Sequence, residues 1–307
     1  MSALSIRFRH LQTFLEVARQ KSVSQAAEAL HVSQPAVTKT MRELEAALGT
    51  ALLEKDGRGI RITHQGEIFL RHATASVSAI RNGIDSVRRE LGGRGPTVRV
   101  GALPTVSARI MPRAVDLYLK AAGGDGIRVA TGENLVLLNQ LRLGDLDVVV
   151  GRLAAPELMT GLAFEHLYSE QIGFVVRAGH PLLATRHLDF ERIGEFTILM
   201  PPPGSVIRPF VERFLISNGV VELPAQVETV SDSFGRAFVR QTDAIWIIST
   251  GVVAQELTEG VFRTLPIDTT ETRGSVGLTT RADAAATPQL QLLMQTLREA
   301  ASGEAAL

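Results

Sequence analysis

Four side chains suited to reading nucleic acid recur on one face of a predicted helix: Gln34, Thr38, Lys39 and Arg42. Gln can pair with both hydrogen-bonding positions of an adenine, Thr can contact a thymine methyl group, and Lys or Arg can hold guanine or phosphate. Because these residues lie near the N-terminal end of that helix, the sequence predicts binding in the major groove of DNA. The alternative is an ordinary pair of amphipathic helices with a solvated polar face.

Two predicted helices and a tight turn must position these side chains. We expect the first helix at residues 24–30, a turn at residues 31–32, and a second helix capped by Ser33. Pro35 fits the first turn of the second helix, where no backbone donor is needed. The core face of this helix has apolar residues three and four positions apart: Val37, Met41, Leu44 and Leu48. The pattern predicts a helix–turn–helix motif at about residues 24–43.

A short hairpin is expected directly after this motif. Two β segments at residues 52–55 and 60–63 flank the Gly-rich turn DGRG. Next to a helix–turn–helix such a hairpin is a wing, from which Arg58 and Arg61 could reach phosphate or the minor groove. The alternative is a plain exposed loop. A further amphipathic helix at residues 9–20 would pack behind the motif.

A long helix follows, with an unbroken seam of apolar residues. The seam residues are spaced alternately three and four apart: Leu70, Ala73, Val77, Ile80, Ile84, Val87 and Leu91. Such a narrow stripe favours pairing with another helix, and the same helix of a second copy is the simplest partner. We therefore predict a dimer. The alternative is a long helix that packs on its own C-terminal domain. The Gly- and Pro-containing segment 92–96 then predicts a domain boundary.

From residue 97 onward, apolar β segments alternate with helical patterns, which is typical of an α/β fold. We expect strands at 98–102, 127–130, 148–151, 172–177, 197–200, 226–230, 244–249 and 275–280. We expect helices at 107–121, 134–143, 207–217, 231–240 and 289–300. Ligands of such folds bind where strands end and helices begin.

Four of these strand-to-helix turns, at 104–107, 131–134, 202–205 and 231–233, are rich in hydroxyl and amide side chains. Free backbone N–H groups at the helix starts suit an anion such as a carboxylate. Arginines in the first turns of three helices would add positive charge: Arg109, Arg208 and Arg236. The alternative is that these Ser, Thr and Asp residues only cap helices. The four hydroxyl-rich turns, taken together with the arginines, predict a cleft that binds a small molecule.

Length and composition limit the remaining possibilities. A chain of 307 residues suggests two or three domains, and 45% hydrophobic with 21% charged residues is typical of a globular protein. The absence of cysteine excludes a disulfide framework and a thiol nucleophile. No run of residues is long and apolar enough for a membrane span, so we expect a cytoplasmic protein. Residues 1–66 carry nine Lys or Arg against six Asp or Glu, a mildly basic N-terminus that fits a nucleic-acid module.

An enzyme is the rival class, because many enzymes share this α/β texture. The chain has no nucleophile-elbow GxSxG, no HExxH, no P-loop and no GxGxxG after a strand. Its seven histidines are scattered without ligand spacing, so we expect neither a metal nor a cofactor. A transport binding protein is the second rival, but the N-terminal DNA-binding pattern argues against it.

The N-terminal pattern resembles the LysR-type transcriptional regulators. The matching residues are Phe14, Ala18, Ser22, Ala26, Ala27, Leu30, Ser33, Gln34, Pro35, Ala36, Val37, Leu44, Glu45, Leu48, Gly49, Leu52, Thr63 and Gly66. The resemblance covers essentially the whole chain. It implies ligand-responsive control of transcription, with promoter DNA, a small organic-acid effector, RNA polymerase and further copies of the chain, as a tetramer, as partners.

The resemblance also implies an architecture: a winged helix–turn–helix domain (residues 1–65), a linker and dimerisation helix (66–92), and a two-lobed α/β effector-binding domain similar to periplasmic binding proteins (97–307). Lobe 1 would comprise about 97–168 with 269–303, and lobe 2 about 169–268. Leu53, His64 and Gln65 depart from the commonest family residues, but none is an expected DNA contact.

The resemblance and the chemistry together give three sets of expected site residues. The DNA-binding set is Ser33, Gln34, Pro35, Thr38, Lys39, Arg42, Arg58 and Arg61. The effector-binding set is Thr105, Ser107, Arg109, Thr131, Asn134, Gly204, Ser205, Arg208, Ser231, Ser233 and Phe234. The dimerisation set is Leu70, Val77, Ile80, Ile84, Val87 and Leu91.

Within the family, five stretches are most similar to regulators of protocatechuate catabolism and to related regulators of a galactose-binding protein. They are residues 101–112, 161–170, 176–183, 205–209 and 228–238. The first likeness implies an activator of an aromatic-acid operon with an effector such as β-carboxy-cis,cis-muconate. The second implies control of a sugar or transport operon, which stays open as the alternative.

Overall fold

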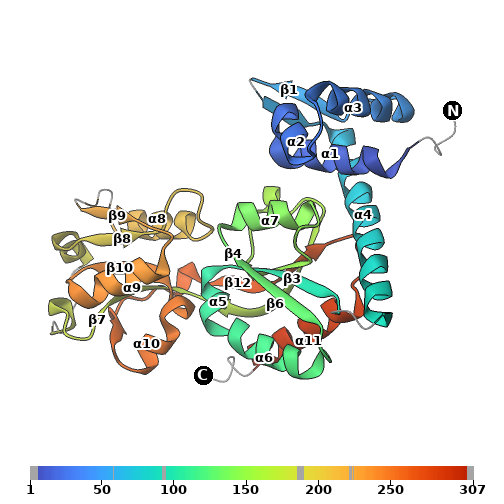
Figure 1. Cartoon of the computed structure of the whole chain (residues 1–307). Helices are drawn as coiled ribbons and strands as arrows, with labels where there is room; N and C mark the ends of the chain where they lie inside the picture. Colours follow the sequence, from blue (N-terminus) through green and yellow to red (C-terminus); the bar gives the residue numbers. More distant parts are fainter. Residues whose placement is uncertain are drawn as a thin grey trace.

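The computed structural model describes residues 6–57, 59–91, 95–184, 190–220, 223 and 225–302. Three parts follow one another along the chain, as Figure 1 shows: a small helical domain with a hairpin, a long helix, and two neighbouring lobes that each contain a sheet. This is a multidomain fold with a winged helix–turn–helix followed by mixed α/β lobes. No helix among the described residues is long and apolar enough to cross a membrane.

The N-terminal domain consists of three helices and a two-stranded hairpin. Its elements are α1 (Phe8–Gln20), α2 (Val23–Ala29), α3 (Gln34–Leu48), β1 (Leu53–Asp56) and β2 (Gly59–Ile62). The helices enclose one apolar core that includes Phe14, Val37, Leu44 and Leu52. The strands pair antiparallel, with Leu53 opposite Ile62. The wing expected from the sequence is therefore present as a hairpin.

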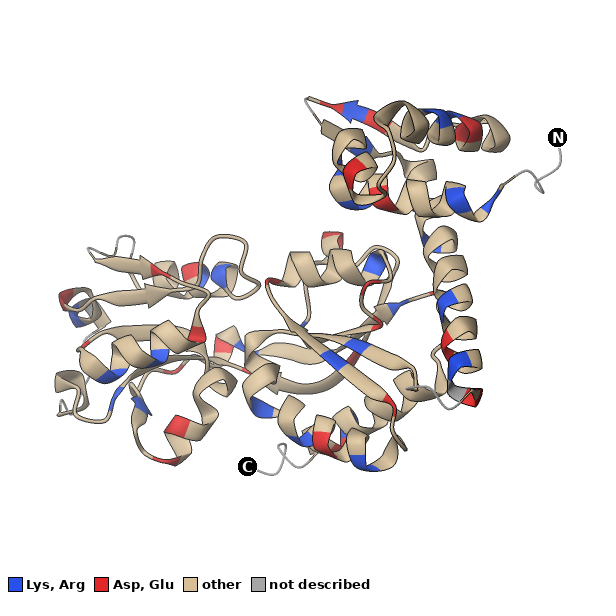
Figure 2. Cartoon of the chain, viewed as in Figure 1, with Lys and Arg blue, Asp and Glu red and all other residues tan. Residues whose placement is uncertain are grey.

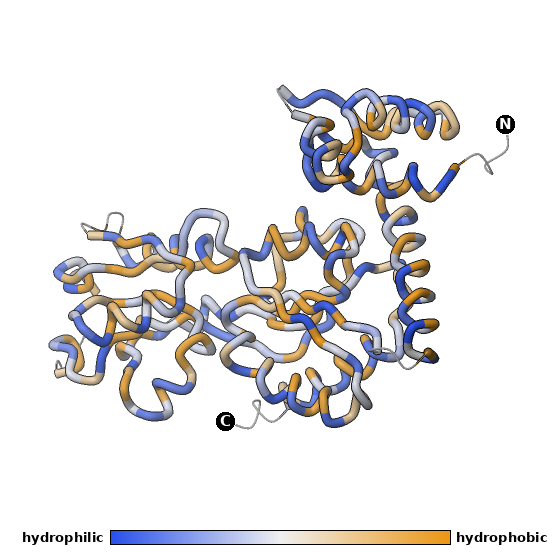
Figure 3. The backbone as a smooth tube through the Cα atoms, in the orientation of Figure 1, coloured by the Kyte–Doolittle hydropathy of each residue, from blue (hydrophilic) through white to orange (hydrophobic). Residues whose placement is uncertain are grey.

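Helix α4 (His64–Glu90) leaves this domain and runs along the side of the first lobe (Figure 1). Its start is fixed by Thr63, whose hydroxyl donates to the carbonyl oxygen of Ala51 at 2.8 Å and accepts from the Gly66 N–H at 3.0 Å. Figure 3 shows hydrophobic residues recurring along this helix over its whole length.

Lobe 1 is a five-stranded sheet in the order β4-β3-β5-β12-β6. Its strands are β3 (Thr97–Ala102), β4 (Gly126–Thr131), β5 (Val148–Arg152), β6 (Leu162–Glu170) and β12 (Gly274–Arg281). Its helices are α5 (Pro104–Arg109), α6 (Met111–Ala121), α7 (Asn134–Arg142) and α11 (Pro288–Ser302). Strand β6 ends at Glu170, two residues past the lobe boundary expected from the sequence.

Lobe 2 is a five-stranded sheet in the order β11-β7-β10-β8-β9. Its strands are β7 (Ile172–Arg177), β8 (Ile198–Met200), β9 (Gln226–Glu228), β10 (Ile245–Ser249) and β11 (Phe262–Thr264). Its helices are α8 (Arg208–Ser217), α9 (Asp232–Gln241) and α10 (Ala254–Thr258). In both lobes parallel strands end at one edge of the sheet, and this arrangement brings the strand-to-helix turns together.

The structure corrects the expected helix 107–121 and adds strands β6 and β11 and helix α10. The predicted helix 107–121 is two helices, because Pro112 lacks an N–H and its ring disfavours continuation from the preceding turn. Strands β6 and β11 were not expected. β6 is a half-buried edge strand with His166 and two glutamates, so its apolar alternation is weak. β11 has three residues, too few to give a period.

Candidate nucleic-acid interface and ligand cavity

Helix α3 presents the expected polar residues on one shared surface. Gln34, Pro35, Thr38, Lys39 and Arg42 line a shallow open groove, together with Glu43 and Ala46. All of them except Thr38 and Glu43 are exposed, and these two are half-buried. The groove therefore offers amide, hydroxyl and cationic groups to the outside, as direct recognition of base edges requires.

The orientation of α3 follows from its apolar face and its two ends. Val37, Met41 and Leu44 are each at most 5% exposed, which turns the opposite polar face to solvent. Gly49 ends the helix in the left-handed conformation at φ 71°. Ser33 occupies the N-cap position with extended backbone, but its side chain makes no capping hydrogen bond to α3. The expectation that its hydroxyl caps the helix is wrong, whereas Ser22 does cap α2 through the Gln25 N–H.

Contacts within the domain orient several of these side chains. The Thr38 hydroxyl donates to the Gln34 carbonyl oxygen at 3.1 Å, and the Ser24 hydroxyl donates to the Gln34 side-chain oxygen at 3.4 Å. Glu43, the acidic member of the groove, interacts with His10 at 3.3 Å and with Arg9 at 3.1 Å. The hydrogen bond to His10, followed by that to Arg9, lowers the pKa of Glu43. Figure 2 shows Lys and Arg interspersed with acids on this domain, not gathered on one basic face.

The wing is attached to α3 through one carboxylate. Glu45 Oε1 accepts from the backbone N–H groups of Leu52 at 2.8 Å and Leu53 at 3.3 Å. Arg61 lies on β2 and pairs with Glu54 on β1, Nη2 to Oε1 at 2.8 Å. Arg58, expected at the tip, lies outside the described residues. This role of Glu45, which joins the wing to α3, was not expected from the sequence.

A second site, a cavity of about 490 Å³, lies between the two lobes. Five of the expected effector residues line it: Ser107, Thr131, Asn134, Ser205 and Ser233. They come from turns that are far apart in the chain, at the starts of α7, α8 and α9 and within α5. The lining therefore combines hydroxyls and an amide with the N-terminal ends of helices, where backbone N–H groups favour anions.

The arginines that were expected to add charge point elsewhere. Arg208 Nε lies 2.6 Å from Glu212 Oε1, and its Nη1 lies 2.8 Å from Glu228 Oε1. Arg236 Nε lies 2.7 Å from Glu256 Oε1. Arg109 Nη1 lies 3.6 Å from Glu170 Oε1. Because each of these guanidinium groups faces a carboxylate of its own domain, none lines the cavity.

Four other expected residues also lie outside the cavity lining: Thr105, Gly204, Ser231 and Phe234. Thr105 is 7% exposed, and Phe234 stacks on Phe238 with ring centroids 5.4 Å apart. The Ser231 hydroxyl accepts from the Phe234 N–H at 3.3 Å, so it caps α9. The Ser231 side chain therefore caps a helix, which was the alternative to binding an anion.

The acidic residues and the tryptophan of the lining were not expected from the sequence. Glu133, Asp232 and Trp246 all line the cavity. Burial raises the pKa of Asp232, an effect only partly offset by Arg236. Trp246 is the only tryptophan of the chain and is 2% exposed, with α9 packed so closely that a Cβ on Gly235 would lie 2.5 Å from its ring. Among the described residues, no group of three His, Cys, Asp or Glu could hold a metal.

The apolar seam of α4 is divided between two environments. Leu70 is 4% exposed, and Val77 packs against the core of the N-terminal domain. Ile80, Ile84 and Val87 are 46%, 48% and 61% exposed, and Leu91 just beyond the helix is 82% exposed. The first half of the seam thus completes the chain's own core, and the second half is uncovered in the single chain.

Comparisons with known proteins match both halves of the chain to one family. Residues 8–67 match the family model described as bacterial regulatory helix-turn-helix protein, lysR family, and residues 91–302 match the LysR substrate binding domain. The chain is 62% identical to the HTH-type transcriptional regulator PcaQ of Agrobacterium fabrum, over 96% of this chain and 95% of that one. It is 28% identical to the regulator GbpR of Azospirillum brasilense, over 80% of this chain and 72% of that one.

The fold is similar to that of full-length LysG from Corynebacterium glutamicum, a LysR-type regulator solved with bound effector Arg. The TM-score is 0.64 at 18% identity, with 97% of this chain and 99% of that chain covered. The named relatives are transcriptional regulators, which favours this class over the enzyme alternative. The two family models and the extensive identity to PcaQ make this chain a member of the LysR family of DNA-binding transcriptional regulators.

Proposed function

We propose that this protein activates a protocatechuate (pca) catabolic operon in response to a small carboxylate such as β-carboxy-cis,cis-muconate. The observation that carries the proposal is the 62% identity to PcaQ over 96% of the chain. Identity at this level over both domains supports a shared operator type and a shared effector class. The proposed division is a DNA-binding domain at residues 1–65, a linker helix at 66–92 and an effector-binding domain at 97–307.

For the DNA-binding half, the proposal assigns base contacts to Gln34, Thr38 and Arg42 and backbone contacts to Lys39. Their common exposed groove on α3 supports this assignment. The remaining proposed contacts are Ser33, Pro35, Arg58 and Arg61. Arg61 must exchange its pairing with Glu54 for phosphate, which is inexpensive because both side chains are largely exposed.

For the effector half, the proposal places the carboxylates of the ligand against the hydroxyls and helix starts of the inter-lobe cavity. Ser107, Thr131, Ser205 and Ser233 support this role by their positions in the lining. Because no described Lys, Arg or His lines the cavity, backbone N–H groups and hydroxyls must supply the anion recognition.

A neutral polyol is the second candidate effector, and one observation favours it. The lining holds Glu133, Asp232 and Trp246, and carboxylates with an aromatic ring suit the hydroxyls and apolar face of a sugar better than they suit an anion. The sugar or transport operon was inferred from the likeness to regulators of a galactose-binding protein. The similarity to GbpR agrees with this alternative.

The proposed mechanism couples the two sites through quaternary structure. An effector in the cavity closes the lobes, and pairing of the exposed half of α4 between subunits then changes the spacing of two recognition helices on DNA. We further propose that the assembly is a tetramer and that it contacts RNA polymerase. Thermodynamic linkage requires that DNA and effector change each other's affinity by the same factor.

Selection from genomic DNA tests the proposal. Sheared DNA from the source organism is passed over the purified protein at physiological salt, and the retained fragments are sequenced. We expect enrichment of a promoter with an interrupted inverted repeat beside genes for protocatechuate breakdown. Enrichment beside sugar-transport genes supports the polyol alternative, and uniform, salt-sensitive retention of all fragments contradicts sequence-specific regulation. Arg298→Ala, on lobe 1, is the control that should leave the selection unchanged.

A further inference from the structure

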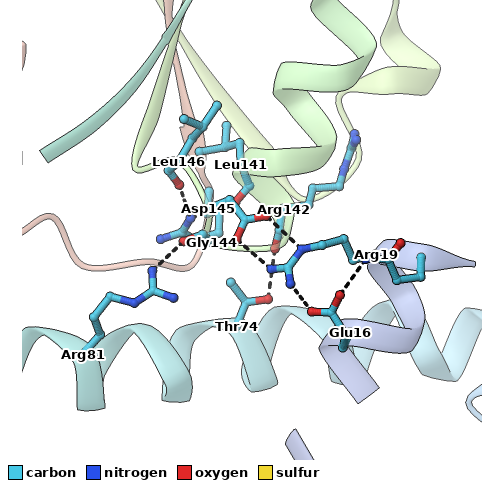
Figure 4. Close-up of polar contacts among 11 residues, drawn as sticks. Glu16, Arg19, Thr74, Arg81, Leu141, Arg142, Gly144, Asp145 and Leu146 are labelled. Carbon is cyan, nitrogen blue, oxygen red and sulfur yellow. Dashed lines mark hydrogen bonds and ion pairs between the residues drawn. The ribbon is translucent and has the colours of Figure 1, made fainter. Parts of the chain in front are cut away.

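The turn that follows α7 is docked against the N-terminal domain of the same chain. Arg19 of α1 holds Asp145 of this turn through two hydrogen bonds, Nε to Oδ2 at 3.1 Å and Nη2 to Oδ1 at 2.7 Å. Glu16 accepts a hydrogen bond from the Nη1 atom of the same guanidinium group (Figure 4). The Gln20 side chain donates to Glu16 at 2.8 Å. A two-pronged arginine–carboxylate pair fixes orientation as well as distance.

The linker helix caps the C-terminal end of α7. The Thr74 hydroxyl donates to the Arg142 carbonyl oxygen at 3.0 Å, and Arg81 Nη1 donates to the Gly144 carbonyl oxygen at 3.0 Å (Figure 4). Carbonyls at a helix end have no partner within the helix and must find one elsewhere. Here Thr74 of α4 provides the partner of the Arg142 carbonyl, and Arg281 of β12 donates to the carbonyl oxygen of Leu141. Arg81 of α4 and Arg281 also hold the turn just beyond the helix, at the carbonyl oxygens of Gly144 and Leu146.

Apolar packing closes the same junction. Leu143 packs against the core of the N-terminal domain, although it belongs to the end of α7. Gly144 next to it has φ 75°, and a Cβ built there would lie 2.8 Å from Thr74 Cγ2. The turn approaches α4 so closely that a Cβ at position 144 would collide with the methyl group of Thr74, and the positive φ also favours glycine.

The opposite end of α7 lies at the inter-lobe cavity. Asn134, the first residue of the helix, lines the cavity and is 7% exposed. Leu137, Leu138 and Leu141 are at most 1% exposed, so the body of the helix is buried against lobe 1 and its two ends move together. Nine helical residues span about 13 Å, and the chain therefore has a short helix with one end at the cavity and the other at the junction with α1 and α4.

We propose that α7 couples the cavity to the winged helix–turn–helix within one subunit, through the junction of its end with Arg19, Thr74 and Arg81. A ligand that contacts the start of α7 displaces the helix, and the junction transmits this displacement to the recognition domain. The inference rests on the proposed effector cavity but adds a route that does not pass through subunit pairing.

A reversible crosslink tests whether the junction exists in solution. The chain contains no cysteine, so Thr74→Cys with Gly144→Cys introduces a single thiol pair. Each Cβ of a disulfide lies about 3 Å from the opposite sulfur, close to the 2.8 Å that separates a Cβ at 144 from Thr74 Cγ2. We expect rapid crosslinking within one chain under mild oxidation. Failure to crosslink in a protein that is still folded by circular dichroism would overturn the proposal, and Thr74→Cys alone is the control.

The coupling itself is measured with Asp145→Ala in the full-length protein. The affinity for the selected promoter is determined with and without β-carboxy-cis,cis-muconate, and the ratio of the two affinities is the coupling factor. We expect a wild-type factor of about fivefold or more and a variant factor at least about twofold smaller, while the variant still binds each ligand alone. The coupling that remains in the variant passes through subunit pairing. Arg298→Ala removes a comparable two-pronged pair, with Glu165, away from the junction and should keep the wild-type factor. An undiminished factor in Asp145→Ala contradicts the proposal.

A ligand-independent experiment separates this inference from the choice of effector. Ser205→Trp places an indole from lobe 2 in the cavity that Asn134, the first residue of α7, also lines. We expect it to change the rate of crosslinking between residues 74 and 144 several-fold. Calorimetry shows whether β-carboxy-cis,cis-muconate binds to the wild type. If it does not bind but Ser205→Trp changes the crosslinking rate, the proposed effector is wrong and the coupling role of α7 stands. A rate that is the same with and without the indole overturns the coupling role.

Discussion

At the scale of single residues, position on a common surface does not imply a common role. Gln34 and Lys39 both line the groove on α3, yet an amide can discriminate one base pair by paired hydrogen bonds, whereas an exposed ammonium group attracts any phosphate. The two side chains therefore predict different responses to substitution.

Gln34→Ala should weaken binding to the selected promoter by about 1–3 kcal/mol and relax the preference at one base pair. Lys39→Ala should weaken binding to promoter and random DNA alike and reduce the salt dependence of the affinity. Both affinities are measured by fluorescence anisotropy at several salt concentrations. Equal losses on promoter and random DNA for Gln34→Ala would exclude it from base recognition.

Asp232 lines the cavity, and its burial affects the protonation of its carboxyl group. Burial raises the pKa of its carboxyl above the ordinary value of 3.8. The fold therefore favours the neutral acid, and this contribution to stability is present at low pH and lost as the pH rises through the raised pKa. Ionisation also places a negative charge beside any bound anion.

The affinity for the proposed tricarboxylate should accordingly fall as the pH rises from 3.8 through the raised pKa of Asp232. Asp232→Asn should bind the anion several-fold more tightly at neutral pH and remove this part of the pH dependence, as measured by calorimetry. Glu133→Gln is the matched control in the same lining and should leave the pH dependence in place. A polyol effector would show little pH dependence in either protein.

At the scale of elements, the wing and the linker helix meet at one glycine. A Cβ on Gly66 would lie 2.2 Å from the Leu52 carbonyl oxygen and 2.5 Å from Ile62 Cγ2. Gly83, in the middle of the same helix, has nothing within 4 Å of the position of a Cβ. The two glycines of α4 thus differ in the space around them.

Gly66→Ala should lower the free energy of unfolding by about 1–3 kcal/mol, because the backbone of the wing must move. Gly83→Ala should raise it by up to about 1 kcal/mol, because alanine favours the helix and meets no obstacle. Both changes are followed by denaturant unfolding of the full-length protein. A loss of the same size at both positions would show that the contact with the wing is not the cause.

At the scale of the whole molecule, the second half of the α4 seam is an apolar stripe that the rest of the described chain leaves exposed. Ile80, Ile84 and Val87 are each more than 45% exposed on one stripe. An apolar stripe of this kind on a helix favours pairing with a second copy. The opposite side of α4, with Asn82, faces a cavity against lobe 1.

Ile84→Asp should therefore shift the protein to smaller assemblies, as measured by sedimentation velocity, and should reduce promoter binding because two half-sites are no longer held together. Asn82→Asp adds the same charge on the side that faces lobe 1 and should leave the assembly intact. If both variants sediment like the wild type, the α4 seam is not the dimer interface.

The sequence by itself determined the features that depend on near neighbours along the chain. The spacing of Val37, Met41 and Leu44 fixed which side of α3 is buried, and therefore which residues face outward. Gly49, the hairpin around Asp56 and Gly57, and most strands of both sheets were likewise predictable, because turn chemistry and apolar periodicity act over a few residues.

Only the tertiary structure decided which distant partner each side chain takes. Arg208 and Arg236 had the position expected of anion ligands, but nearby carboxylates hold them outside the cavity. Leu70 and Ile84 belong to one uniform heptad pattern, yet one completes a core and the other is exposed. The junction of Arg19 with Asp145 joins residues 126 positions apart. Local spacing specifies the face of an element, whereas the element packed against that face depends on how the whole chain folds.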